Sequence, residues 1–103
     1  MSLFKAFKKN SVKVENGVQK ATITVDKGYQ PDHLNLEKGM PVELTFHRLN
    51  PSGCLSEIVL KDFNIHDELP LNEDHIVRFT PNESGEYGFA CGMDMFHGKL
   101  TVK

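Results

Sequence analysis

The sequence predicts one all-β domain, an antiparallel Greek-key β-sandwich of seven or eight short strands. Runs of alternating apolar and polar residues, rich in β-branched and aromatic side chains, recur along the chain. Gly, Pro and Asn interrupt these runs at short intervals, as they do in the turns between strands. No segment of ten or more residues has a convincing helical repeat. At 103 residues the chain is long enough for one such sandwich and no second domain.

The first half of the chain contains the strongest strand signals. We expect strands at 21–25 and 33–36, separated by a segment that contains Gly28 and Pro31. The run 42–49 is the clearest, because it alternates with period two over eight residues. Each of two predicted strands should place one row of side chains on a single face. In the strand 21–25 this row is Ala21, Ile23 and Val25, and in the strand 42–49 it is Val42, Leu44, Phe46 and then Arg48.

The second half is more interrupted. A turn at 50–53, with the sequence Asn-Pro-Ser-Gly, leads to a short strand at 57–60. The segment 61–73 is irregular in pattern, because proline and asparagine interrupt it. Three further strands complete the predicted sandwich: 74–80, 85–90 leading into Cys91, and 98–102.

Composition indicates an ordinary globular domain that does not bind nucleic acid. The chain is 39% hydrophobic and 25% charged, and its net charge of −2 provides no basic surface for nucleic acid. No apolar run approaches the roughly 20 residues that span a bilayer, and the first 14 residues lack the apolar core of a signal peptide. We divide the chain into a flexible basic N-terminal tail, 1–11, and a domain, 12–103, which we expect to be monomeric.

The tail has two interpretations. Its segment 3–9 combines two phenylalanines with three lysines. Such a segment is typical of a frayed chain end. It would also suit a position close to anionic lipid, if a membrane anchor precedes it in the natural chain.

The segment 91–98, Cys-Gly-Met-Asp-Met-Phe-His-Gly, concentrates soft metal donors. Thiolates and thioethers are the ligands that monovalent copper prefers. The only other cysteine, Cys54, follows the turn at 50–53, so the fold alone can bring the two thiols together. We predict that Cys54 and Cys91 form a high-affinity copper(I) site with His97 as a plausible third donor. Met93 and Met95 would form a weaker second site.

Other residues of this segment have expected supporting roles. Gly92 and Gly98 should permit backbone conformations that a loop around an ion requires. Phe96 should either shield the metal from water or pack against the core. The four remaining histidines lack ligand spacing and are expected to be structural: His33, His47, His66 and His75.

Several alternatives remain open at this point. Methionine in a β-protein is usually core filler, and a lone cysteine usually behaves as a small buried hydrophobe. Zinc is less suited, because methionine is a poor zinc ligand and the chain has no closely spaced cysteine pair. A disulfide between the two cysteines without any metal is a further possibility. Cys91 paired with a histidine could act as a nucleophile, but no hydrolase or nucleotide-binding motif is present, so we do not expect an enzyme.

From about Val12 to Lys103 the chain resembles the cupredoxin family. The residues that carry the resemblance are the turn leading to Cys54, the run 79–91 that ends at Cys91, and the final Met-x-Met-x-His-Gly. Blue copper members have a histidine where this chain has Cys54, and their last loop supplies cysteine, histidine and methionine in another order. A His2Cys set with a weak axial methionine suits one-electron cycling, whereas two thiolates with thioethers favour Cu(I).

The pattern is similar to the cupredoxin-fold copper(I) chaperones of Gram-positive copper-resistance systems. It is also similar to the related N-terminal domain of copper-exporting P-type ATPases. This resemblance implies a bis-thiolate site, a methionine-rich second site and thus two copper ions, with copper passed to the exporter. It further implies an upstream membrane anchor in the chaperone form, with the domain facing the cytoplasm. An electron-transfer cupredoxin, or the N-terminal domain of the exporter itself, is the alternative.

Overall fold

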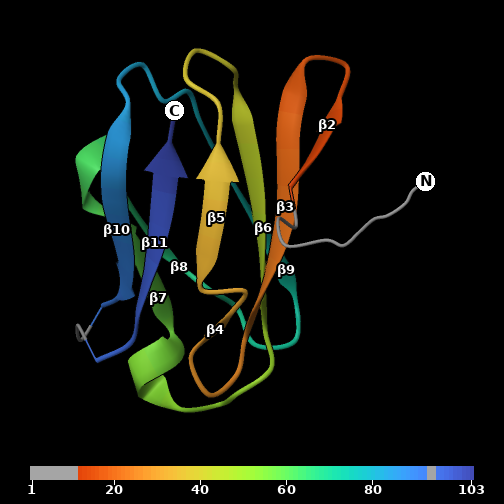
Figure 1. Cartoon of the computed structure of the whole chain (residues 1–103). Helices are drawn as coiled ribbons and strands as arrows, with labels where there is room; N and C mark the ends of the chain where they lie inside the picture. Colours follow the sequence, from red (N-terminus) through yellow and green to blue (C-terminus); the bar gives the residue numbers. More distant parts are fainter. Residues whose placement is uncertain (1–11, 93–94) are drawn as a thin grey trace.

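Two β-sheets packed face to face form the computed structural model, which describes residues 12–92 and 95–103 (Figure 1). The predicted tail, 1–11, and the predicted ligand Met93 lie outside the described residues. The first sheet has the order β5 (His33–Leu36), β11 (His97–Val102), β10 (Gly85–Cys91), β7 (Glu57–Leu60) and β8 (Ile65–Glu68). The second has the order β2 (Lys13–Glu15), β3 (Val18–Val25), β6 (Val42–Arg48) and β9 (Asp74–Phe79), with β4 (Tyr29–Gln30) paired to β3. Two 3₁₀ turns, η1 (Gly53–Leu55) and η2 (Lys61–Phe63), flank β7.

The all-β sandwich is confirmed, but two details of the prediction are wrong. The described residues form ten strands rather than seven or eight, because β2 and β4 are only three and two residues long and β8 lies in the segment 61–73, whose pattern is irregular. The sheets are also mixed, since β3 pairs with β6 in parallel and β5 pairs with β11 in parallel. Alternation of side chains identifies the buried face of a strand but not the direction of its neighbour. Two parallel strands must be joined by a crossover connection. The connection from β3 to β6 is of this kind, because it passes through β5, which belongs to the opposite sheet.

The core forms where the inward rows of the two sheets meet. Every member of the predicted rows in β3 and β6 is buried, including Arg48 at 8% exposure. Near the end of the sandwich that carries Cys91, three aromatic rings pack together. The Phe89 ring lies 5.0 Å from the Tyr29 ring and 6.0 Å from the Phe46 ring, measured between centroids. These contacts connect the middle of both sheets to the end of β10.

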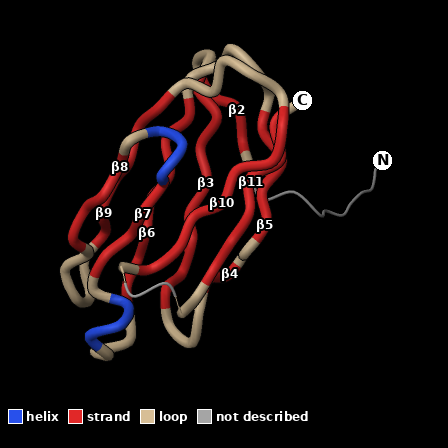
Figure 2. The backbone as a smooth tube through the Cα atoms, turned by 90° about the vertical axis from the view of Figure 1, so that its left-hand side faces the viewer, coloured by secondary structure: helices blue, strands red, loops and turns tan. Residues whose placement is uncertain are grey.

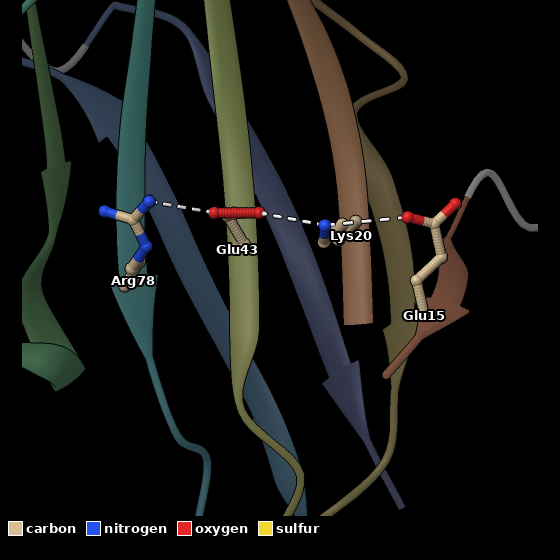
Figure 3. Close-up of polar contacts among 4 residues, drawn as sticks. All are labelled: Glu15, Lys20, Glu43 and Arg78. Carbon is tan, nitrogen blue, oxygen red and sulfur yellow. Dashed lines mark hydrogen bonds and ion pairs between the residues drawn. The ribbon is translucent and has the colours of Figure 1, made fainter. Parts of the chain in front are cut away.

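The outer face of the second sheet carries a ladder of ion pairs across four strands (Figure 3). Lys20 Nζ lies 3.5 Å from Glu15 and 3.7 Å from Glu43, and Arg78 Nη2 lies 3.0 Å from Glu43. Most of these side chains are exposed, so each pair contributes about 0–1 kcal/mol. Their value lies in the pairing of opposite charges across neighbouring strands, which favours this strand order.

No helix in the described part of the chain is long and apolar enough to cross a membrane.

Candidate metal centre

Strand pairing places Cys54 and Cys91 at the same end of the sandwich. Cys91 is the last residue of β10 and pairs with Ile58 of the antiparallel strand β7. Cys54 lies in η1, which comes directly before β7. Because an antiparallel strand begins where its partner ends, η1 and the end of β10 lie together, as both views of the backbone show (Figure 1, Figure 2). The two cysteines form no disulfide with each other in the structure.

The sulfur of Cys91 points into the sandwich and accepts backbone hydrogen bonds. Its residue is 2% exposed and follows Phe89 on the inward face of β10. The N–H groups of Met95 and Phe96 donate to Cys91 Sγ at 3.1 and 3.4 Å. Hydrogen bonds from N–H groups stabilise a sulfur more when it carries negative charge. Met95 and Phe96 therefore supply two donors that would also serve a negatively charged sulfur at Cys91.

Cys54 sits on a turn that its own hydrogen bonds hold in place. Ser52 caps η1, because its Oγ accepts from the N–H of Cys54 at 3.4 Å. The N–H of Ser52 in turn donates to Asn50 Oδ1 at 2.9 Å. Ser56 Oγ closes the turn by donating to the carbonyl of Gly53 at 2.7 Å. The Cys54 residue is partly exposed, so its thiol is held at the surface while Cys91 is buried.

Arg48 fixes this turn from inside the molecule. It is the last residue of β6 and is buried with the core-facing row. Its guanidinium donates to three carbonyl groups: those of Asn50 at 3.0 Å, Ser52 at 3.0 Å and Leu69 at 2.9 Å. A guanidinium presents several donors in a rigid fork, so one side chain connects the Cys54 turn to the segment before β9. The sequence marked Arg48 only as the next member of an inward row.

We predict that Arg48→Met lowers the free energy of unfolding by about 2–4 kcal/mol, because it removes three hydrogen bonds from a charged donor, one of them buried. Urea unfolding measures this change. Arg78→Met is the matched control, since Arg78 is the only other arginine and makes an exposed pair with Glu43. The control should change stability by less than about 1 kcal/mol. Equal stability of the two variants would contradict the role assigned to Arg48.

The turn between β3 and β4 lies against both cysteine loops. Asn50 Nδ2, in the Cys54 turn, donates to Asp26 Oδ1 at 3.3 Å. On the other side, a Cβ placed on Gly28 would lie 3.5 Å from the ring of Phe96. This β3–β4 turn therefore connects the two loops, and Tyr29 follows it directly.

Tyr29 brings a hydroxyl group to the same end of the core. The residue is 8% exposed, and its hydroxyl is buried without a hydrogen-bond partner among the described residues. Burial raises the pKa of Tyr29 well above its ordinary value, and negative charge on Cys91 and then Cys54 raises it further. The sequence offered no signal for Tyr29, which lies in a two-residue strand.

The methionine and glycine residues of the segment 91–98 have different environments. Met95 is 65% exposed, so its thioether is open to solvent. Phe96 packs against the core, which was one of its two expected roles. Gly92 and Gly98, expected to give the loop conformational freedom, have no positive φ. Their surroundings differ: a Cβ at Gly98 would lie 2.1 Å from the Phe89 ring, whereas a Cβ at Gly92 would lie 2.1 Å from the end of the flexible Glu57 side chain, which can move aside.

His97 lies on the other face of the sheet from the Cys91 sulfur. It is exposed and pairs across the strands with Ala90, while Phe89 and Cys91 face inward. The other four histidines each bond to a side chain elsewhere in the fold, as structural residues would. Their partners are Thr101 for His33, Asp74 for His47, Glu57 for His66 and Asp67 for His75.

The donor chemistry at this end suits a soft ion. Two thiols, one accepting two N–H hydrogen bonds, lie at the same end as an exposed thioether and a hydroxyl that has no hydrogen-bond partner in the described part of the chain. Thiolate and thioether ligands select Cu(I) over harder ions. Within residues 12–92 and 95–103, no three His, Cys, Asp or Glu side chains gather into a possible metal site. The three-ligand set of two cysteines and His97 is therefore not assembled in this structure.

Residues 1–102 match the family model of the cupredoxin-like domain. The chain belongs to the cupredoxin family. A comparison with curated proteins gave no match.

Two solved structures are similar to this cupredoxin domain in sequence as well as fold. The first is the metal-binding domain of the Cu(I)-exporting P-type ATPase CopA from Streptococcus pneumoniae, crystallised with Cu(I). It is 44% identical, with a TM-score of 0.89, and the match covers 91% of this chain and 94% of that one. The second is a copper-binding protein solved by NMR in the apo form. It is 42% identical, with a TM-score of 0.85 and coverage of 89% and 94%. Auracyanin B, at 18% identity and a TM-score of 0.67 over 91% and 94%, shares the fold alone.

Proposed function

We propose that this cupredoxin domain binds Cu(I) between the thiolates of Cys54 and Cys91 and passes it to a copper-exporting P-type ATPase by ligand exchange. The observation that carries the proposal is the meeting of the two cysteine loops at one end of the sandwich, on either side of the β3–β4 turn. The similarity to a Cu(I) exporter domain at 44% identity supports both the ion and the partner. The domain would act in copper resistance, as a monomer, without catalysing a reaction.

The proposed second site uses the thioethers of Met93 and Met95. Exposure of Met95 supports this role, because a thioether in solvent can take up an ion and release it again. Thioethers bind Cu(I) more weakly than thiolates do, so this site would hold the second ion loosely. We leave His97 out of the tight site, since its side chain faces away from the Cys91 sulfur.

The N-terminal domain of an exporter is the second candidate for the whole protein, and the similarity to the CopA domain favours it. In that case copper passes between domains of one chain, and the domain is tethered at the membrane by the transporter itself. In the stand-alone form, an anchor upstream of residues 1–11 would hold it near the cytoplasmic face. The chemistry proposed for Cys54 and Cys91 is the same in both forms.

Titration of the reduced protein with Cu(I), in competition with a calibrated chelator, tests the proposal. We expect two classes of site with different affinities. Addition of Cu(II) under air distinguishes the electron-transfer alternative, because a blue copper site would develop intense colour. A bis-thiolate site should stay colourless and oxidise towards a disulfide. Intense, stable colour, or the absence of any tight Cu(I) binding, would contradict the proposal.

We predict that Met93→Leu combined with Met95→Leu weakens the loose class of site and leaves the tight class unchanged. Leucine has a similar volume but no sulfur, so the change removes the ligand with little effect on packing. The same chelator competition measures both classes. Met40→Leu is the control, since Met40 lies next to the start of β6, whereas the Cys54 turn follows its end. Loss of the tight class in the double variant would show that the two sites are one.

A further inference from the structure

A tyrosine hydroxyl lies buried at the end of the core where the two cysteine loops meet. Tyr29 is 8% exposed, and its ring packs at 5.0 Å on the ring of Phe89, which precedes Cys91 on the inward face of β10. The β3–β4 turn just before it contacts Asn50 on one side and Phe96 on the other. The tyrosine therefore stands between the loop that carries Cys54 and the loop that carries Cys91.

The hydroxyl of Tyr29 has no hydrogen-bond partner among residues 12–92 and 95–103. Buried polar groups are nearly always paired, and an unpaired one destabilises the fold. A phenylalanine would fill the same space without this loss. The hydroxyl is therefore available to donate to an acceptor that another state of the protein would bring to it.

Binding of Cu(I) would create such an acceptor. Two thiolates and one monovalent ion carry a net charge of −1, and a buried anion requires hydrogen-bond donors. The N–H groups of Met95 and Phe96 already donate to Cys91 Sγ from the loop after β10. A neutral thiol is only a weak acceptor, so a third donor would gain little before the thiol ionises. Burial keeps the phenol protonated, because the pKa of Tyr29 is raised, so the group can donate.

We propose that Tyr29 is a positioning residue of the copper site, whose hydroxyl donates a hydrogen bond to the copper-bound thiolate of Cys91. This inference rests on the proposed copper(I) function. It assigns to Tyr29 the role that outer-shell donors have in other metal sites, where their loss typically lowers metal affinity by about 10–100-fold. Tyr29 does not itself bind the ion.

Tyr29→Phe tests this assignment, and Tyr87→Phe is its matched control. The chain has only these two tyrosines, and the hydroxyl of Tyr87 donates to the carbonyl of Glu83 at 2.7 Å. In Tyr29→Phe we expect the melting temperature of the metal-free protein to stay equal or rise, while Cu(I) affinity falls about tenfold. In Tyr87→Phe we expect the opposite, with a lower melting temperature and unchanged Cu(I) affinity.

A spectroscopic measurement on Tyr87→Phe provides an independent readout. The chain has two tyrosines and no tryptophan, so in this variant Tyr29 is the only source of tyrosine signals. The pair of tyrosine ring bands in the Raman spectrum responds to hydrogen bonding of the hydroxyl. Their intensity ratio should change on Cu(I) loading towards that of a hydrogen-bond donor.

Three outcomes would overturn the assignment. If the parent binds Cu(I) tightly and Tyr29→Phe binds it within twofold of the parent, the hydroxyl has no role and the proposed function stands. A fall in affinity accompanied by a clear fall in the melting temperature of the metal-free protein would assign the effect to packing. If the parent itself does not bind Cu(I) tightly, the proposed function fails together with this inference.

Discussion

Cys91→Ser and Cys54→Ser are each expected to abolish the tight class of Cu(I) site. Loss of an outer-shell partner alone costs about 10–100-fold in metal affinity. Loss of one of two thiolate ligands should therefore cost at least about a hundredfold, or roughly 3 kcal/mol. Serine retains the size of the side chain but not the soft donor. Chelator competition on the reduced protein measures the change.

The two cysteine variants differ in what else they change. Cys91 is buried, so a serine hydroxyl there must find a partner, and we expect a small loss of stability. Cys54 is partly exposed, so its variant should melt like the parent. His97→Ala is the control for a nearby donor outside the tight site. Tight Cu(I) binding by Cys54→Ser at the parent's affinity would exclude a bis-thiolate site, whatever Cys91→Ser does.

Gly98→Ala is expected to give a large loss of stability. A Cβ at this position would lie 2.1 Å from one atom of the Phe89 ring and 2.5–2.6 Å from two others. The ring cannot move freely, because it packs between the rings of Tyr29 and Phe46. Overpacking of this kind costs about 2–3 kcal/mol, which corresponds to a fall in melting temperature of roughly 10–20 °C for a domain of this size.

Gly53→Ala is the matched control for this substitution. No atom lies within 4 Å of a Cβ placed on Gly53, so the control should melt within a few degrees of the parent. Phe89→Leu combined with Gly98→Ala should recover part of the loss, because leucine vacates the space that the new methyl group needs. A double-mutant cycle measures this coupling. If Gly98→Ala melts like Gly53→Ala, the close packing of Gly98 and Phe89 is not a constraint on the fold.

Sequence patterns predicted most of the sandwich, because a strand with one buried face alternates between apolar and polar residues. The rows in β3 and β6 were predicted residue by residue, and Arg48 continues its row as a buried charge. This alternation carries no information on the direction of neighbouring strands, and a strand of two residues such as β4 is too short to show it. It therefore could not reveal that β4 brings Tyr29 to the end of the core.

The sequence proposes ligands for the candidate site but says nothing of the residues that support it. Cysteine and methionine spacing reveals donors, since soft ligands are rare and cluster visibly in a chain. The guanidinium of Arg48 acts through carbonyl groups of the backbone, and such contacts leave no trace in residue types. For Gly98, the structure shows the proximity of the Phe89 ring as a reason for glycine, whereas the sequence suggested only backbone freedom.

The unequal exposure of the two thiols gives the proposed transfer a direction. Cys91 is enclosed and its sulfur accepts two N–H groups, whereas Cys54 stands partly open on a single turn. An arriving sulfur from the acceptor would reach the metal on the Cys54 side and form a three-coordinate intermediate. If the bond to Cys54 then broke before the bond to Cys91, the proposed exchange would be associative and would not release the ion as a free species.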